Sequence, residues 1–173
     1  MCLKIDYIYG NKYKTMPIIS IAFAAIAGGI HVLFFLMESI FWMNPKVHRG
    51  FGIKTVAEAE QFKLSFFNQG FYNLFLALGI FVSIFLLFSG YFIAGKTLLL
   101  FCCASMFSAS IVLLVSKPNM LRGVFIQGLA PLAALLSCWI WGWFIIFDIE
   151  RQNHSYLPNC LYMNDKIRHT NKL

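Results

Sequence analysis

Charged residues are scarce in this sequence. Of its 173 residues, 12% are charged, 60% are hydrophobic and 17% are aromatic. A soluble domain averages about 25% charged residues, so this chain has too little polar surface to cover a globule in water. Its length allows one domain, and the apolar residues fall in long blocks with no second compact unit between them. The composition therefore excludes an ordinary soluble domain and indicates an integral membrane protein.

Asp, Glu, Lys and Arg are missing altogether from four stretches, residues 15–37, 64–95, 97–116 and 123–147. A bilayer core about 30 Å thick needs roughly 20 helical residues, so each stretch can span it. Backbone groups in lipid must be satisfied within their own segment, and the strict alternation of a barrel strand is absent, so helices are favoured. We predict an all-α membrane protein, a four-transmembrane-helix bundle. Its spans are expected at about 17–43, 64–88, 96–116 and 123–147.

Local signals set the ends of these helices. Pro17 suits a first helical turn, and Asn44-Pro45 should end the first helix, because the residue before proline avoids the α region. Thr55 and Glu58 match a capping box, so the second helix can begin at Val56, before it enters lipid. Further breaks are expected at Ser89-Gly90, at Ala94-Gly95 and at the turn of residues 116–119.

Both ends of the chain are polar. Residues 1–15 form a polar N-terminal extension, and residues 148–173 are expected to be a loose C-terminal tail. The first span has a signal-peptide alternative, with residues 25–27 as a cleavage site. Its apolar run continues well past that site and ends in Phe41 and Trp42, which are typical interfacial aromatics. A retained membrane helix is the favoured interpretation.

The net charge of +7 is carried by the short segments between and beyond the apolar blocks. That distribution is typical of a membrane protein and not of a nucleic-acid-binding stripe, so the expected partner is membrane lipid and no nucleic acid. The N-terminus, second loop and tail together hold eight Lys and Arg, against six in the first and third loops. The excess favours cytoplasmic termini.

Cysteine usage gives no sign of a metal centre or a disulfide framework. The five cysteines are odd in number and lack C-x-x-C spacing, and three of them lie inside apolar blocks. His154, Cys160 and His169 in the tail lack metal-ligand spacing. We therefore expect no metal and no cofactor.

Polar residues inside the spans are the first place to look for function, because they are costly there. In the first helix, His31 and Glu38 are seven residues apart and should share one face. The second span begins with a polar arc on one helical face, made of Ser65, Asn68, Gln69, Tyr72 and Asn73. The fourth helix contributes Gln127. We predict a polar site of His31, Glu38, Asn68, Gln69, Tyr72, Asn73 and Gln127.

Four crossings bring these groups to one leaflet. Glu38 is near the end of the first helix, Gln69 is near the start of the second, and Gln127 is near the start of the fourth. These ends must share one side of the membrane, and Lys117 and Arg122 bound the third loop there as possible charge partners. The expected result is a polar cup that opens toward the first and third loops.

Each residue also has a structural alternative. Glu38 can be an interfacial acid paired with Lys117 or Arg122, and His31 can be a buried neutral side chain hydrogen-bonded to Asn or Tyr. The side-chain amides of Asn68, Gln69 and Asn73 can form interhelical hydrogen bonds, each of which stabilises the helix pair by roughly 0.6 kcal/mol. Gly70 and Gly128 are expected to mark close helix contacts. These alternatives remain open at the level of the sequence.

Three segments resemble a known family. They are the segment from His31 through Glu38 to Trp42, the string at 68–73 (Asn-Gln-Gly-Phe-Tyr-Asn) with residues 75–77, and Gln127-Gly128 with Pro131. They are similar to the bacterial membrane family called domain of unknown function 1304, over about residues 16–147. The resemblance implies a small four-helix protein of the bacterial cytoplasmic membrane and no established activity. Members tend to begin near the position of Met16, so the start at Met1 or Met16 stays open.

Three functions fit these observations. The favoured one is a non-enzymatic binding or permeation site for a small solute or proton, because intramembrane carboxylates and histidines commonly mark such paths. One subunit is small for a transporter, which leaves a homo-oligomer open. The alternatives are a structural or accessory membrane subunit, and a membrane-embedded enzyme on a hydrophobic substrate with Glu38 as acid or base.

Overall fold

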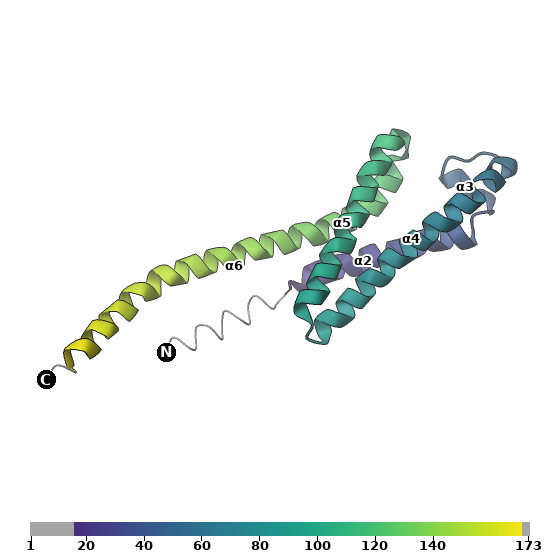
Figure 1. Cartoon of the computed structure of the whole chain (residues 1–173). Coiled ribbons are helices and arrows are strands. Elements are labelled where there is room, and N and C mark those ends of the chain that lie inside the picture. Colours follow the sequence, from purple (N-terminus) through teal and green to yellow (C-terminus); the bar gives the residue numbers. More distant parts are fainter. Residues whose placement is uncertain (1–15, 171–173) are drawn as a thin grey trace. The chain divides into compact units, whose positions relative to one another are not determined.

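The structure, a computed structural model, describes the backbone of residues 16–170, which is helical apart from short turns (Figure 1). Side chains are described for residues 16–148 and for residue 151. The elements are α2 (Ile18–Phe35), the π-helix η1 (Leu36–Ile40), α3 (Pro45–Gly50), α4 (Val56–Phe88), α5 (Phe92–Ser116), the 3-10 turn η2 (Pro118–Met120) and α6 (Leu121–Thr170).

Four helices are long and apolar enough to cross a membrane. They are Ile18–Ile40, Val56–Phe88, Phe92–Ser116 and the described part of the last helix, Pro118–Asp148. No strand occurs within residues 16–170. The predicted all-α bundle of four transmembrane helices is confirmed, and its composition is compatible with an integral multi-pass membrane protein.

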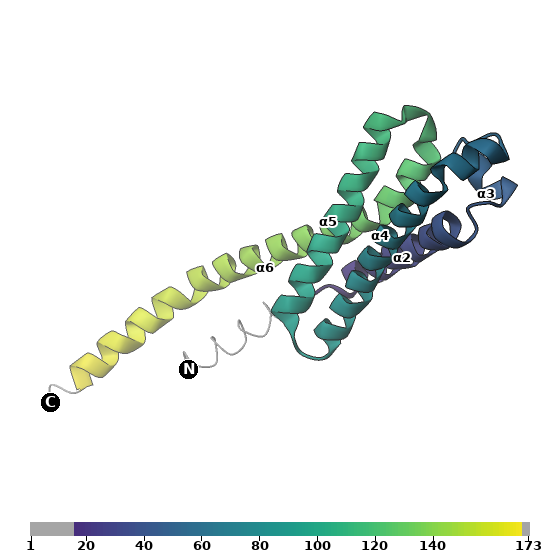
Figure 2. The same cartoon turned by 45° about the vertical axis from the view of Figure 1, so that its right-hand side comes forward.

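The chain divides after Cys138 into two units, which are described separately. The unit formed by Lys14–Cys138, called the bundle unit below, contains α2 to α5 and the first part of α6. Its helices α2, α4 and α5 lie side by side in both views (Figures 1 and 2). In the other unit, the side chains of Trp139, Trp141 and Trp143 are all exposed.

Small residues let the helices of the bundle unit approach one another. Its buried apolar core is made of Ala24, Ala27, Ile80, Leu87, Leu99, Cys102, Cys103, Met106 and Ala134. A Cβ atom on Gly28 would lie 3.2 Å from Ile80 Cγ2, and one on Gly128 would lie 2.9 Å from Ser110 Cβ. Lipid is as apolar as leucine, so membrane helices associate through this kind of close packing. The close contact predicted at Gly128 is confirmed.

The start of α4 was correctly predicted. Thr55 Oγ1 accepts from the Glu58 amide at 3.2 Å, and Val56 is the first helical residue. The Glu58 carboxylate accepts from the amide of Lys54 at 3.2 Å, one residue before the N-cap. The capping box therefore begins the helix as expected. The Glu58 carboxylate accepts from the amide of Lys54 rather than from that of the N-cap residue Thr55.

The end of the first helix is more elaborate than predicted. The helical turns stop at Ile40, and Asn44 then caps the short helix α3 by accepting from the Lys46 amide at 3.0 Å. Proline at the first position of a helix is favoured because it needs no amide partner there. Asn44-Pro45 thus starts a new helix rather than only closing the previous one.

The break predicted at Ala94-Gly95 is wrong. The α4–α5 turn lies at Ser89–Tyr91, where Gly90 has a φ of 87°, and α5 already begins at Phe92. Gly95 lies inside α5, where a Cβ would be 2.9 Å from the backbone N of Leu87. This glycine allows close packing between α4 and α5. The neighbouring residues in the sequence do not show whether such a glycine lies in a turn or in a helix contact.

The expectation of a loose tail is wrong for residues 148–170, which continue α6 as helix to Thr170. These residues directly continue the membrane-spanning part of α6. Extending an existing helix avoids the cost of nucleating a new one, so a polar sequence can propagate it.

Candidate functional site

A π-turn presents Glu38 to the inside of the bundle unit. The backbone amide of Phe41 donates to the carbonyl of Leu36 at 2.8 Å, an i to i+5 bond that inserts one residue into the α-helical pattern. Glu38 lies in the middle of this turn and is 2% exposed. Single π-turns inside α-helices are frequent at functional sites. The local backbone therefore marks the same residue that the sequence singled out as an intramembrane acid.

Two amides from α4 hold the carboxylate of Glu38. Asn73 Nδ2 donates to Oε2 at 2.8 Å, and Gln69 Nε2 donates to Oε1 at 3.3 Å. The two donors are four residues apart, so they project from one face of α4, one turn above the other. Each oxygen thus has its own donor, which fixes the orientation of the carboxylate.

Gly70 allows the two helices to come this close. A Cβ atom at Gly70 would overlap Ser39 Oγ and would lie 3.2 Å from Glu38 Cβ. Ser39 Oγ in turn donates to the carbonyl of Phe67 on α4 at 2.9 Å. The close contact predicted at Gly70 is confirmed, and it adjoins the carboxylate itself.

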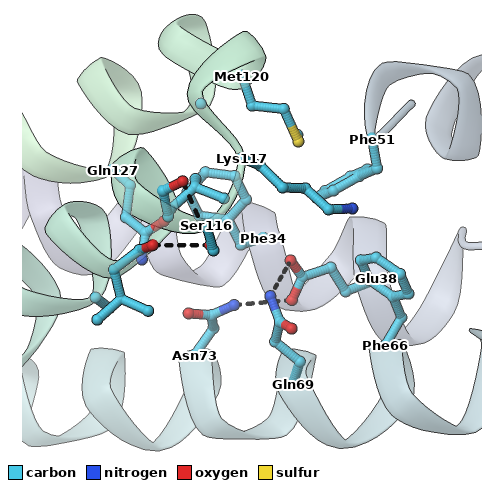
Figure 3. A pocket seen from close by; sticks show the side chains of 14 residues that line it. Phe34, Glu38, Phe51, Phe66, Gln69, Asn73, Ser116, Lys117, Met120 and Gln127 are labelled. Carbon is cyan, nitrogen blue, oxygen red and sulfur yellow. Dashed lines mark hydrogen bonds between the residues drawn. The ribbon is translucent and has the colours of Figure 1, made fainter. Parts of the chain in front are cut away.

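The Glu38 carboxylate borders a cavity of about 500 Å³. The wall opposite α4 comes from the end of α5, the third loop and the start of α6 (Figure 3). The lining residues are Phe34, Glu38, Phe51, Phe66, Gln69, Asn73, Ala109, Val112, Leu113, Ser116, Lys117, Met120, Gly123 and Gln127. Residues of the first and third loops thus line one cavity at the same end of the bundle unit.

Lys117 brings a positive charge to this cavity without neutralising Glu38. Figure 3 shows its side chain extending over the cavity on the side of Glu38 and Phe51. Within residues 16–148 and 151, no Lys or Arg forms an ion pair with Glu38. Arg122 is exposed and does not line the cavity.

An aromatic cap, defined here as Trp42, His48, Phe51 and Phe66, lies beside the cavity. The Trp42 ring stacks on Phe66 with centroids 3.7 Å apart, and its Nε1 donates to the Ala59 carbonyl at 2.8 Å. His48 is buried, and its Nδ1 is 2.8 Å from the Ile53 carbonyl. Phe51 and Phe66 belong both to this cap and to the cavity wall.

The structure brings together part of the predicted site. Glu38, Gln69, Asn73, Gln127 and Lys117 all line the cavity. Asn68 and Tyr72 are exposed on another face of α4, with 68% of Tyr72 accessible.

His31 is separate from the cavity as well. It is fully buried, and its Nδ1 is 2.9 Å from the carbonyl of Ala27, one turn earlier in the same helix. His31 lies seven residues before Glu38, about 10 Å along the helix axis, and it does not line the cavity that Glu38 borders.

The sequence interpretation missed the aromatic wall of Phe34, Phe51 and Phe66. Phenyl side chains at the end of an apolar run look the same whether they face lipid, core or a cavity. One available signal was the capping box at Thr55, because it places Phe66 three turns inside α4, within reach of the first loop.

A buried carboxylate, fixed amides and apolar walls define a class of protein, a small four-helix membrane protein with a cavity at the end of its bundle. The chain belongs to the family described as "Protein of unknown function (DUF1304)", whose profile matches residues 14–139. The resemblance seen in the sequence is thereby confirmed. Neither a curated protein nor a solved structure matches the chain significantly.

Proposed function

We propose that this protein binds a small solute in the cavity bordered by Glu38. The observation that carries the proposal is a carboxylate only 2% exposed on the wall of a cavity of about 500 Å³. Ligand pockets typically measure about 300–1,000 Å³ and combine apolar walls with a few placed polar groups. An ionisable residue inside a membrane span is expensive and is by default a functional residue.

The amides of Gln69 and Asn73 make interhelical hydrogen bonds to Glu38, and they leave other polar groups of the cavity for a solute. Gln127 lines the opposite wall, and its side chain makes no hydrogen bond to the described part of the chain. An amide on a cavity wall with free donors and acceptors can contact a solute directly.

Filling the cavity should abolish solute binding. Ala109 is a small lining residue without polar atoms, so Ala109→Phe occupies the space while leaving Glu38 and its donors in place. We expect at least one of four phenyl-bearing probes (benzyltrimethylammonium, benzoate, phenylalanine, benzyl alcohol) to stabilise the wild type thermally in nanodiscs. Saturation at about 100 times Kd stabilises by about 2.7 kcal/mol, and the variant should show none of that shift.

Ala104→Phe is the matched control, because Ala104 is exposed on the same helix and does not line the cavity. It should respond to the probes as the wild type does. The proposal fails when no probe stabilises the wild type, or when Ala109→Phe retains the full shift.

We further infer that the cavity opens away from the cytoplasm. The excess of Lys and Arg in the N-terminus, second loop and tail favours cytoplasmic termini, which puts the first and third loops on the outer side. Lys46 and Asn119 are exposed residues of those two loops, and Ser89 is exposed in the second. In a background without native cysteines, Lys46→Cys and Asn119→Cys should react with an impermeant maleimide added outside cells.

Ser89→Cys is the control and should react only after the cells are opened. If Lys46→Cys and Asn119→Cys are labelled from opposite sides of the membrane, the two loops cannot line one cavity. If both are labelled only after the cells are opened, the orientation is the opposite of the one inferred.

A further inference from the structure

The charges and walls of the cavity point to one class of ligand. Resting on the proposed function, we propose that the cavity takes a small organic cation, an ammonium group with apolar or aromatic substituents, with Glu38 as its counter-ion. The proposal depends on three features of the bundle unit: a buried acid that forms no ion pair with a described Lys or Arg, three phenyl rings and an exposed lysine.

The Glu38 carboxylate has lone pairs that its two amide donors do not use. An ionised carboxylate offers about four lone-pair sites on its two oxygens. The amides of Asn73 and Gln69 occupy one site on each oxygen. Neutral amides orient the carboxylate but do not neutralise it, and a buried charge is stable only when it is paired. A cationic ligand in the cavity supplies that missing partner.

The remaining walls suit the substituents of an organic cation. Phe34, Phe51 and Phe66 line the cavity from α2, the first loop and α4. A phenyl ring attracts a cation within about 6 Å of its centroid, and it offers no hydrogen bond to a strongly hydrated anion. Ala109, Val112 and Leu113 add aliphatic surface from α5. A metal ion or a sugar has no apolar substituents that could pack against these phenyl and aliphatic side chains.

Lys117 acts as a rival cation. It is exposed, it lies at the third loop, and its ammonium sits on a flexible four-carbon stem. Glu38, by contrast, is buried and held by two donors, so the acidic group of the cavity is fixed in place. Lys117 lines the same cavity as Glu38, so its ammonium group repels an entering cation. Removing its charge should therefore strengthen the binding of cations.

The test compares charge variants of the full chain in nanodiscs of neutral phosphatidylcholine, with benzyltrimethylammonium as the probe in isothermal titration calorimetry. Glu38→Gln keeps the size of the side chain and should weaken binding at least about tenfold, because the ion pair lies in a low dielectric. Lys117→Met should tighten binding about threefold or more. Arg122→Met, which removes a charge at the same loop outside the cavity, should change Kd less than about twofold, because exposed charges are screened.

Each outcome decides between the two proposals. Wild-type affinity in Glu38→Gln, with an unchanged gel-filtration profile and helical circular dichroism, overturns the cation proposal. Weaker binding in Lys117→Met overturns it too, and this readout does not depend on the folding of the Glu38 variant. Binding of benzoate, phenylalanine or benzyl alcohol alone, lost in Ala109→Phe, leaves solute binding intact and rejects the cation. Binding of none of the four probes removes both proposals.

Discussion

Trp42→Ala is expected to lower the free energy of unfolding by about 3–5 kcal/mol, the usual cost of deleting a buried aromatic side chain. Trp42 is 2% exposed, stacks on Phe66 at 3.7 Å and donates to the Ala59 carbonyl. Its removal leaves a void between the first loop and α4 and deletes the indole hydrogen bond to Ala59. An SDS titration in mild detergent, followed by far-UV circular dichroism, measures the loss.

Hydrogen exchange gives a second, local readout of the same change. The amides of α3 should lose protection in Trp42→Ala, because this short helix packs on Trp42 through His48. Trp139→Ala deletes the same atoms from a position that is 69% exposed, and should cost less than about 1 kcal/mol. Equal losses in the two variants would show that the aromatic cap contributes nothing particular to stability.

Gly70→Leu is expected to cost about 3 kcal/mol and to disrupt the site. Even a Cβ at this position overlaps Ser39 Oγ and lies 3.2 Å from Glu38 Cβ, so a leucine must push η1 away from α4. The amides of Gln69 and Asn73 would then no longer reach the carboxylate. The same SDS titration measures stability, and the binding of whichever of the four phenyl-bearing probes stabilises the wild type measures the site.

Gly29→Leu is the control for this substitution. Gly29 lies in α2, and a Cβ there meets no atom within 4 Å. That variant should lose less than about 1 kcal/mol and retain probe binding. Undiminished stability and binding in Gly70→Leu would mean that the helices can separate without affecting Glu38, contrary to the contacts described.

The pairing of Glu38 with Gln69 and Asn73 shows what sequence reasoning can reach. Helical periodicity puts residues 69 and 73 on one face, and four crossings put that face at the depth of Glu38. Both steps depend only on the geometry of a regular helix and the thickness of a bilayer. The hydrogen bonds at 2.8 and 3.3 Å follow that expectation.

His31 and Gly95 show where such reasoning fails. The seven-residue spacing from His31 to Glu38 predicts one shared site, but of these two residues only Glu38 lines the cavity. Gly95 resembles a turn residue in sequence, but it is buried where α4 and α5 touch. Both outcomes depend on contacts with residues distant along the chain.

The sequence by itself determined the number of membrane-spanning helices, the capping box of the second and the end of the bundle where the acid and amides gather. These properties follow from apolar run length and from interactions a few residues apart. Only the tertiary structure decided which polar groups share the cavity and which phenyl rings form its wall. In a bilayer, lipid, core and cavity walls are all apolar, so composition cannot tell which surface a side chain faces until the helices are packed.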